Sequence, residues 1–355
     1  MVDEFELHKS RELANSIRFS EDKHDVTLGL QPSALEKVID EFYRSAVEIN
    51  HNITPKIEAA LKKVCLRLSL DREIVQAFVN NSYEVQAACY YVDANRCLIR
   101  ISSSLVNLLS IQELEFVIGH ELGHFLLQHA PTAKSQETAE YFVFQRAKEI
   151  SADRIGIIGC GSLNFAVSAL IKTASGLNSE HIQVSLKHYL EQLGQLNNPI
   201  RGENLFSTHP SMLIRTFAVS EFLKNISEIK YSSFVGPSVY ARDKILKKFM
   251  DEYVDQEIVN RINTVKYDLE MWVAVEMITR DERFDKLEQE VFEKKFGNED
   301  LEKVKIFLMS TKSDQIKTEI QNKIFETKKR LENIAPSEAH GTLIAIQKSL
   351  DKVFK

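Results

Sequence analysis

The sequence HELGH at residues 120–124 constrains this chain more than any other feature, because its spacing gathers side chains only on a helix. Residues four apart lie one above the other on the same face of an α-helix. His120 and His124 could therefore bind one metal ion, most often zinc, from the same side. Glu121 is turned by about 100° around the helix axis. Its carboxylate could reach a water molecule on the metal and act as a general base without binding the metal itself.

The flanking sequence supports that helix. Ser110 and Glu113 fit a capping box that would begin it, and Pro131 would stop it. Gly119 and Gly123 each cost roughly 1 kcal/mol of helix propensity, and they lie one turn apart. They could admit the backbone of another helix, one that carries a further ligand. Apolar residues at three- and four-residue spacing predict a buried stripe, namely Leu114, Ile118, Leu122 and Phe125.

The composition is that of a globular chain and gives no sign of two classes of partner. The chain has 355 residues, 44% of them hydrophobic and 27% charged, enough for two or three domains. A net charge of −6 gives no reason to expect nucleic acid or an anionic membrane as partner. The acidic N-terminus lacks the basic and apolar regions of a signal peptide. The longest uncharged run, between Arg154 and Lys172, is shorter than the ~20 residues that span a bilayer.

The cysteines agree with a protein of a reducing compartment. Among the four there is no C-x-x-C pair, and their spacings suggest neither a zinc knuckle nor a disulfide framework. Buried free thiols are the expected state, and we expect a cytoplasmic protein without a membrane span. The four are Cys65, Cys89, Cys97 and Cys160.

Secondary-structure patterns predict an α+β fold that is mostly α. Strand-like runs near residues 75–79, 84–92 and 97–102 predict a small three-stranded sheet that packs on the helices. The turn residues 93–95 predict a hairpin between the last two strands. Residues 1–50, most of 138–193 and the motif-free stretch from about 240 to 355 have helical patterns.

Two further stretches carry candidate site residues. Glu149 and Asp153 are four apart on the next expected helix, so one carboxylate could bind the metal while the other accepts a hydrogen bond from a histidine ligand. The alternative is a pair of solvated surface acids. His209, held by a following proline, could stabilise an oxyanion, and Arg215 adds a fixed charge. The alternative for His209 is a surface loop residue.

Five other histidines have no convergent partners in the sequence. We expect them to be solvated or packed rather than functional. They are His51, His129, His181, His188 and His340.

Taken together, these pieces resemble the HtpX-type and CAAX-prenyl-protease-type zinc peptidases, which are gluzincins of metallopeptidase family 48. The matching pieces are the HELGH motif, the pair Glu149 and Asp153, and the stretch STHP at 207–210 followed by Arg215. The resemblance covers about residues 55–225. It implies a zincin-like core at residues 51–235, an N-terminal helical extension at 1–50 and a helical C-terminal domain at 236–355.

The resemblance also implies roles for the residues. His120, His124 and Glu149 would bind one zinc ion per chain. Asp153 would accept a hydrogen bond from a histidine ligand. Glu121 would be the catalytic base. His209 and Arg215 would stabilise the tetrahedral intermediate or brace Glu149. The strand Cys97–Ser102 would be the sheet edge on which an extended peptide is laid.

The expected function is that of a zinc endopeptidase that acts on protein substrates and takes part in protein quality control. The chain differs from prenyl proteases and HtpX relatives in having no membrane-spanning stretch, which argues against a prenylated or membrane-embedded substrate. A regulatory ImmA-type peptidase is an alternative within the enzyme class. Others are an enzyme held latent by its own termini and a non-catalytic, zinc-stabilised protein whose helical C-terminal region binds a protein partner.

Overall fold

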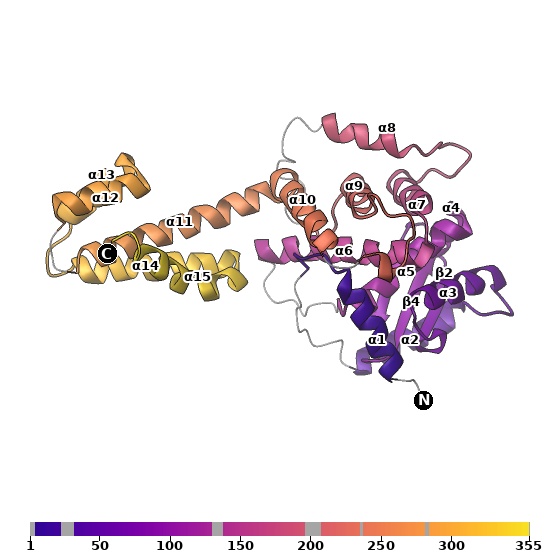
Figure 1. Cartoon of the computed structure of the whole chain (residues 1–355). Coiled ribbons are helices and arrows are strands. Elements are labelled where there is room, and N and C mark those ends of the chain that lie inside the picture. Colours follow the sequence, from indigo (N-terminus) through magenta and orange to yellow (C-terminus); the bar gives the residue numbers. More distant parts are fainter. Residues whose placement is uncertain are drawn as a thin grey trace. The chain divides into compact units, whose positions relative to one another are not determined.

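The computed structural model describes residues 4–22, 32–129, 138–195, 207–234, 237–280 and 284–354. The chain divides into two compact units. The first comprises residues 1–136 and 142–254, and the second comprises residues 137–141 and 255–355. The fold is α+β and mostly helical, with one small sheet packed against helices, which confirms the predicted class (Figure 1). No helix of the described residues is long and apolar enough to cross a membrane.

The first unit contains the sheet and most of the shorter helices. Its strands are β1 (Ala46–Glu48), β2 (Val75–Asn80), β3 (Ala87–Tyr91) and β4 (Cys97–Ser102). Its helices are α1 (Glu4–Ser16), α2 (Pro32–Ser45), α3 (Pro55–Arg67), α4 (Ser103–Leu108), α5 (Ile111–Leu126), α6 (Ala139–Cys160), α7 (Leu163–Ser175), α8 (Leu186–Glu191), α9 (Met212–Phe222) and α10 (Pro237–Tyr253). The start of α6 belongs to the second unit.

The sheet has four strands in the order β1-β2-β4-β3. β2 and β4 are parallel, and β3 and β4 form the predicted antiparallel hairpin. The expectation of three strands was wrong, since Ala46–Glu48 pairs with β2 inside a region expected to be helical. A strand of three residues is too short to show an alternating pattern. The expected edge position of β4 was also wrong, because β4 lies between β2 and β3.

Helix α5 begins with the predicted capping box, in which the Ser110 side chain accepts from the backbone of Glu113 and the Glu113 side chain accepts from that of Ser110. All four residues of its apolar stripe are buried. Its two glycines meet α6. A Cβ added to Gly119 would lie 3.0 Å from the Cα of Gly156, and one added to Gly123 would lie 3.1 Å from the Cα of Ala152. The two backbones are therefore close enough that the side chains of α6 reach the face of α5 that bears the histidines.

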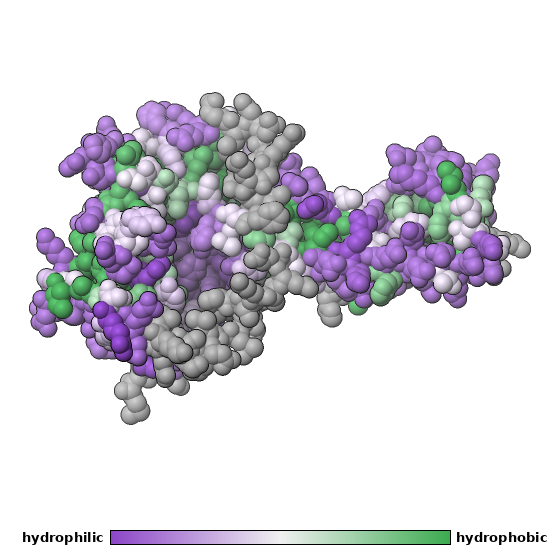
Figure 2. Space-filling model, turned by 180° about the vertical axis from the view of Figure 1, so that it is seen from behind, coloured by the Kyte–Doolittle hydropathy of each residue, from purple (hydrophilic) through white to green (hydrophobic). Residues whose placement is uncertain are grey.

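The second unit is an all-helical bundle with its own core. Its helices are α11 (Gln256–Ile278), α12 (Lys286–Phe296), α13 (Asn298–Ser310), α14 (Ile316–Ile334) and α15 (Pro336–Leu350). α11 packs against α14 and α15, and α12 packs against α13. Leu269, Phe292 and Leu331 are among the buried residues of this core. On the face seen in Figure 2 its surface is mostly hydrophilic, with scattered hydrophobic residues.

The contact between α5 and α6 predicts that Gly156→Ala is destabilising. An added Cβ would lie 2.9 Å from the Phe116 carbonyl oxygen, which cannot move without distorting α5. We expect a loss of about 1–3 kcal/mol in the free energy of unfolding, measured by urea denaturation and circular dichroism.

Gly341→Ala is the matched control, because this helical glycine in α15 has nothing within 4 Å of an added Cβ. Here the alanine should stabilise the helix by about 0.5–1 kcal/mol. Trp272 is the only tryptophan and lies in α11 of the same unit, so its fluorescence reports on this variant. Equal stability of the two variants would contradict the role assigned to the close approach of α5 and α6.

Candidate metal centre and active site

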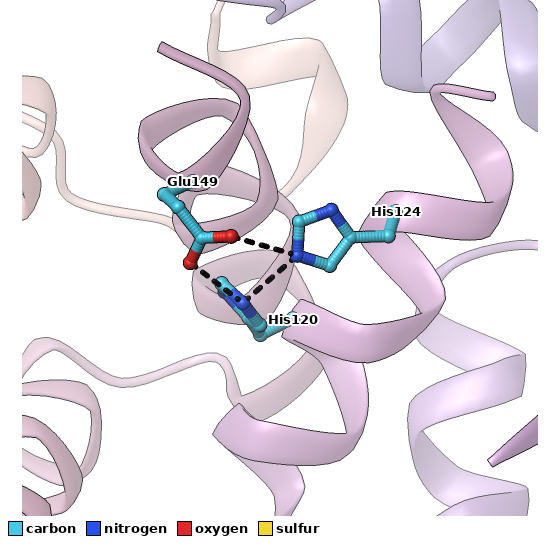
Figure 3. A group of neighbouring side chains, drawn as sticks. All are labelled: His120, His124 and Glu149. Atoms are coloured by element: carbon cyan, nitrogen blue, oxygen red, sulfur yellow. Dashed lines mark hydrogen bonds and ion pairs between the residues drawn. The ribbon is translucent and has the colours of Figure 1, made fainter. Parts of the chain in front are cut away.

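His120 and His124 direct their Nε2 atoms toward the same place. Both lie on α5, four residues apart, and their Nε2 atoms are 3.1 Å from each other. Figure 3 shows both rings pointing toward Glu149 of α6. The Glu149 carboxylate lies with Oε1 3.3 Å from His124 Nε2 and with Oε2 3.4 Å from His120 Nε2. Among the described residues, this is the group of His, Cys, Asp and Glu side chains that could hold a metal ion.

The residues fit a zinc ion. Two nitrogen ligands at about 2.0–2.1 Å in a tetrahedral arrangement would be about 3.3 Å apart, and the Nε2 atoms are 3.1 Å apart. Glu149 Oε2 is buried and makes no hydrogen bond to a residue that the structure describes, although His120 and Arg215 lie near it. A buried carboxylate oxygen without a donor is costly unless a cation satisfies it. Two imidazoles and one carboxylate are a common ligand set of a catalytic zinc.

Asp153 and Arg215 lie beside Nδ1 of His120, the ring nitrogen that faces away from Glu149. Asp153 lies one turn after Glu149 on α6, and its Oδ1 is 3.0 Å from His120 Nδ1. The Arg215 side chain, from α9, donates through Nε to Asp153 Oδ2 at 2.8 Å. Another of its guanidinium nitrogens is 3.6 Å from Glu149 Oε2. The surface-acid alternative for Glu149 and Asp153 is therefore wrong, since both are buried in this network.

The charges of the network shift the pKa values of its members. Burial would lower the pKa of His120, and so would Arg215, but the neighbouring carboxylates of Asp153 and Glu149 prevail and raise it to about 9. Burial would raise the pKa of Glu149, but the two histidines hold it well below its ordinary value. Glu149 is thus ionised at neutral pH. Zinc binding would displace the proton from His120, so that zinc affinity falls as the pH falls.

Glu121 and His209 line one cavity with His120 and Glu149. The same cavity is bordered by Arg215 and by Ala87 at the start of β3. His209 precedes α9, and its Nε2 is 3.3 Å from Glu149 Oε1. Its side chain is 61% exposed, so it stands where a substrate could reach it. The structure thus brings together all seven residues singled out in the sequence: His120, Glu121, His124, Glu149, Asp153, His209 and Arg215.

His129, for which the sequence indicated no partners, contacts two polar side chains. His129 Nδ1 is 2.9 Å from His124 Nδ1, and its Nε2 is 2.9 Å from Asp22 Oδ2. Burial lowers the pKa of His129 to about 4, against the raising effect of Asp22. The expectation of no convergent partners for His129 was therefore wrong. Its position five residues after His124 could have indicated the contact with His124, but nothing in the sequence indicated the contact with Asp22.

The edge of the sheet on the side of α5 is β3, not β4. The Tyr91 hydroxyl at the end of β3 donates to the His124 carbonyl at 2.7 Å, which fixes this strand to the metal-binding helix. Val85, Gln86 and Ala87 border the cavity that holds Glu121. The β3 edge thus runs beside the metal centre.

A helix with two histidines four residues apart, completed by a glutamate from a following helix, defines the gluzincin class of zinc metallopeptidases. Residues 53–143 match the model of Peptidase family M48. The chain therefore carries a domain of this family and is a zinc metallopeptidase, a hydrolase. Glu149, Asp153, His209 and Arg215 follow the matched residues in the sequence. No curated protein and no solved structure matches the chain.

Proposed function

We propose that the protein is an endopeptidase with one zinc ion per chain, bound by His120, His124 and Glu149. The convergence of their ligand atoms within 4.8 Å of one another carries this proposal. Bound zinc would supply Lewis acidity, which acidifies a water molecule and polarises the carbonyl group of the scissile bond. The other steps fall to side chains of the chain itself.

Glu121 is the proposed general base. It neighbours His120 on α5 and lines the cavity, and it is not one of the three clustered ligands. A carboxylate so placed can accept the proton of the attacking water and pass it to the leaving amine. A non-catalytic zinc protein would have no use for a buried carboxylate on the cavity wall, which favours the enzyme over that alternative.

His209 and Arg215 have different proposed roles. His209 is exposed at the cavity, so its ring can donate a hydrogen bond to the oxyanion that develops on the substrate carbonyl. Arg215 is buried, and Asp153 holds its guanidinium. We assign Arg215 to the support of His120 and Glu149, the second of the two roles that the resemblance left open.

The proposed substrate is an extended polypeptide laid along β3. The Ser102 amide donates to the Gln86 carbonyl at 3.0 Å. Because opposite pairs in an antiparallel ladder alternate between bonded and non-bonded, the backbone groups of Ala87 and Cys89 point away from β4. They are free to pair with a peptide by β-augmentation.

Recognition through backbone groups does not select one particular side chain. This lack of side-chain selectivity supports a further part of the proposal, namely that the enzyme acts on unfolded or damaged proteins in the cytoplasm. A protein partner for the helical residues 236–355 stays a prediction.

The first test concerns Glu121→Gln. This variant should bind about one zinc per chain like the native protein, because Glu121 is not a proposed ligand. Turnover of unfolded casein should fall by several orders of magnitude. Metal analysis and a fluorescent casein assay measure the two quantities. The exposed Glu180→Gln is the control, and His120→Ala with Glu149→Ala should lose the zinc. Undiminished turnover by Glu121→Gln would remove that residue from the mechanism.

The second test separates His209 from Arg215. His209→Ala should lower kcat and kcat/KM together by about 100-fold and leave zinc affinity intact, as loss of an oxyanion donor does. Arg215→Ala should lower zinc affinity by about 10- to 100-fold as well as turnover, because it releases Asp153 and Glu149. Chelator competition measures the affinity. Weaker zinc binding in His209→Ala would show instead that this residue supports the ligands.

The third test concerns the sheet edge. Ala87→Pro removes a backbone N–H that points away from β4 and should raise KM for polypeptides about tenfold, the effect of one lost hydrogen bond. Zinc content and thermal stability should stay close to native. Ala88→Pro is the matched control, since it removes an N–H that faces β4 and should destabilise the fold. An unchanged KM in the Ala87 variant would argue against peptide pairing with β3.

A further inference from the structure

A buried chain of side chains leads from the metal centre to the N-terminal segment. His124 directs Nε2 toward the metal site and Nδ1 toward His129, whose other ring nitrogen meets Asp22. The side chain of His129 is 2% exposed and that of Asp22 is 0% exposed. Asp22 lies outside the residues that match the peptidase family. A part of the chain beyond the family domain thus reaches a proposed zinc ligand.

The end of α5 places His129 against His124. Gln128 adopts a left-handed backbone conformation with φ of 58°. The His129 amide donates to the His124 carbonyl at 2.9 Å, and the Gln128 amide donates to that of Phe125 at 3.2 Å. These two bonds make a Schellman motif, which turns the chain back over the last turn of a helix. The contact between the two histidine rings follows from this turn.

The N-terminal segment is fixed on α6 by buried polar contacts. The Phe19 amide donates to the Ser151 hydroxyl at 3.1 Å. Arg154 donates to the Ile17 carbonyl at 3.1 Å and lies over the ring of Phe19. Arg18 donates to the carbonyl of Leu127 at the end of α5 at 2.6 Å. Residues 17–22 are therefore held by both helices of the metal centre.

The protons along this chain fit neutral rings and one carboxylate. If His124 binds the metal through Nε2, its Nδ1 carries the proton and donates to Nδ1 of His129. His129 then carries its proton on Nε2 and donates it to the Asp22 carboxylate. Each nitrogen has one partner of the right kind. His120 has the corresponding support directly, since its Nδ1 meets Asp153.

We propose that Asp22 and His129 are positioning residues that orient His124, so that residues 17–22 complete the zinc centre. The inference rests on the proposed binding of zinc by His124. Hydrogen-bond partners of a histidine ligand fix the tautomer and orientation of its ring and raise its basicity, and their loss costs 10- to 100-fold in metal affinity. The N-terminal segment is on this view a part of the active site rather than an appendage.

The experiment compares zinc affinity in the full-length native protein, Asp22→Asn and His129→Ala by competition with a chromophoric chelator. Both variants should bind zinc about 10- to 100-fold more weakly, and the double variant should lose no more than the stronger single one, because both act through His124. His8→Ala is the control, since this histidine lies on α1, shortly before residues 17–22 in the sequence, and its side chain is exposed. Melting of the zinc-free proteins shows which variants are folded.

A second measurement needs no variant. Nitrogen-15 NMR of the native zinc protein should show His124 protonated on Nδ1 and His129 protonated on Nε2. The opposite tautomers, or zinc affinities of folded variants within twofold of native, would overturn the inference while leaving the proposed function standing. A native protein that binds no zinc would overturn the proposed function and this inference with it.

Discussion

The close approach of α5 and α6 is the contact on which the rest of the site depends. The two histidines need a carboxylate from outside their own helix, and a carboxylate side chain is short. Gly119 on α5 and Gly156 on α6 remove the side chains that would otherwise separate the backbones. The cost in helix propensity, roughly 1 kcal/mol for each glycine, is offset by packing that brings Glu149 to the histidines.

The site also illustrates how buried charges are made tolerable. Two carboxylates of α6, Glu149 and Asp153, lie next to each other in the interior, where isolated charges are strongly disfavoured. Arg215 balances one of them with paired hydrogen bonds, and a divalent ion at the ligand cluster would balance the other. The arginine is the better residue for this use than a lysine, because its planar group can donate to both oxygens of Asp153 at once.

Much of this centre could be predicted from the sequence because its members follow helical spacing. The four-residue spacing of the two histidines predicted that they share one face of α5, and the spacing of Glu149 and Asp153 predicted the same for α6. Asp22 could not be predicted, since no periodicity links it to the motif and its contact with His129 depends on the fold of the N-terminal segment. The strand β1 was missed for a related reason, since its three residues carry no pattern and only pairing with β2 defines them.

The parts of the centre are spread widely along the chain. The histidines lie near residue 120, the carboxylates near 150, and the arginine that secures them at 215. Contacts of such long range form late in folding, because each requires a large loop to close. In a growing chain on the ribosome, the three proposed zinc ligands would be synthesised before Arg215. The buried network around Glu149 and Asp153 can therefore be completed only when the first unit is nearly whole.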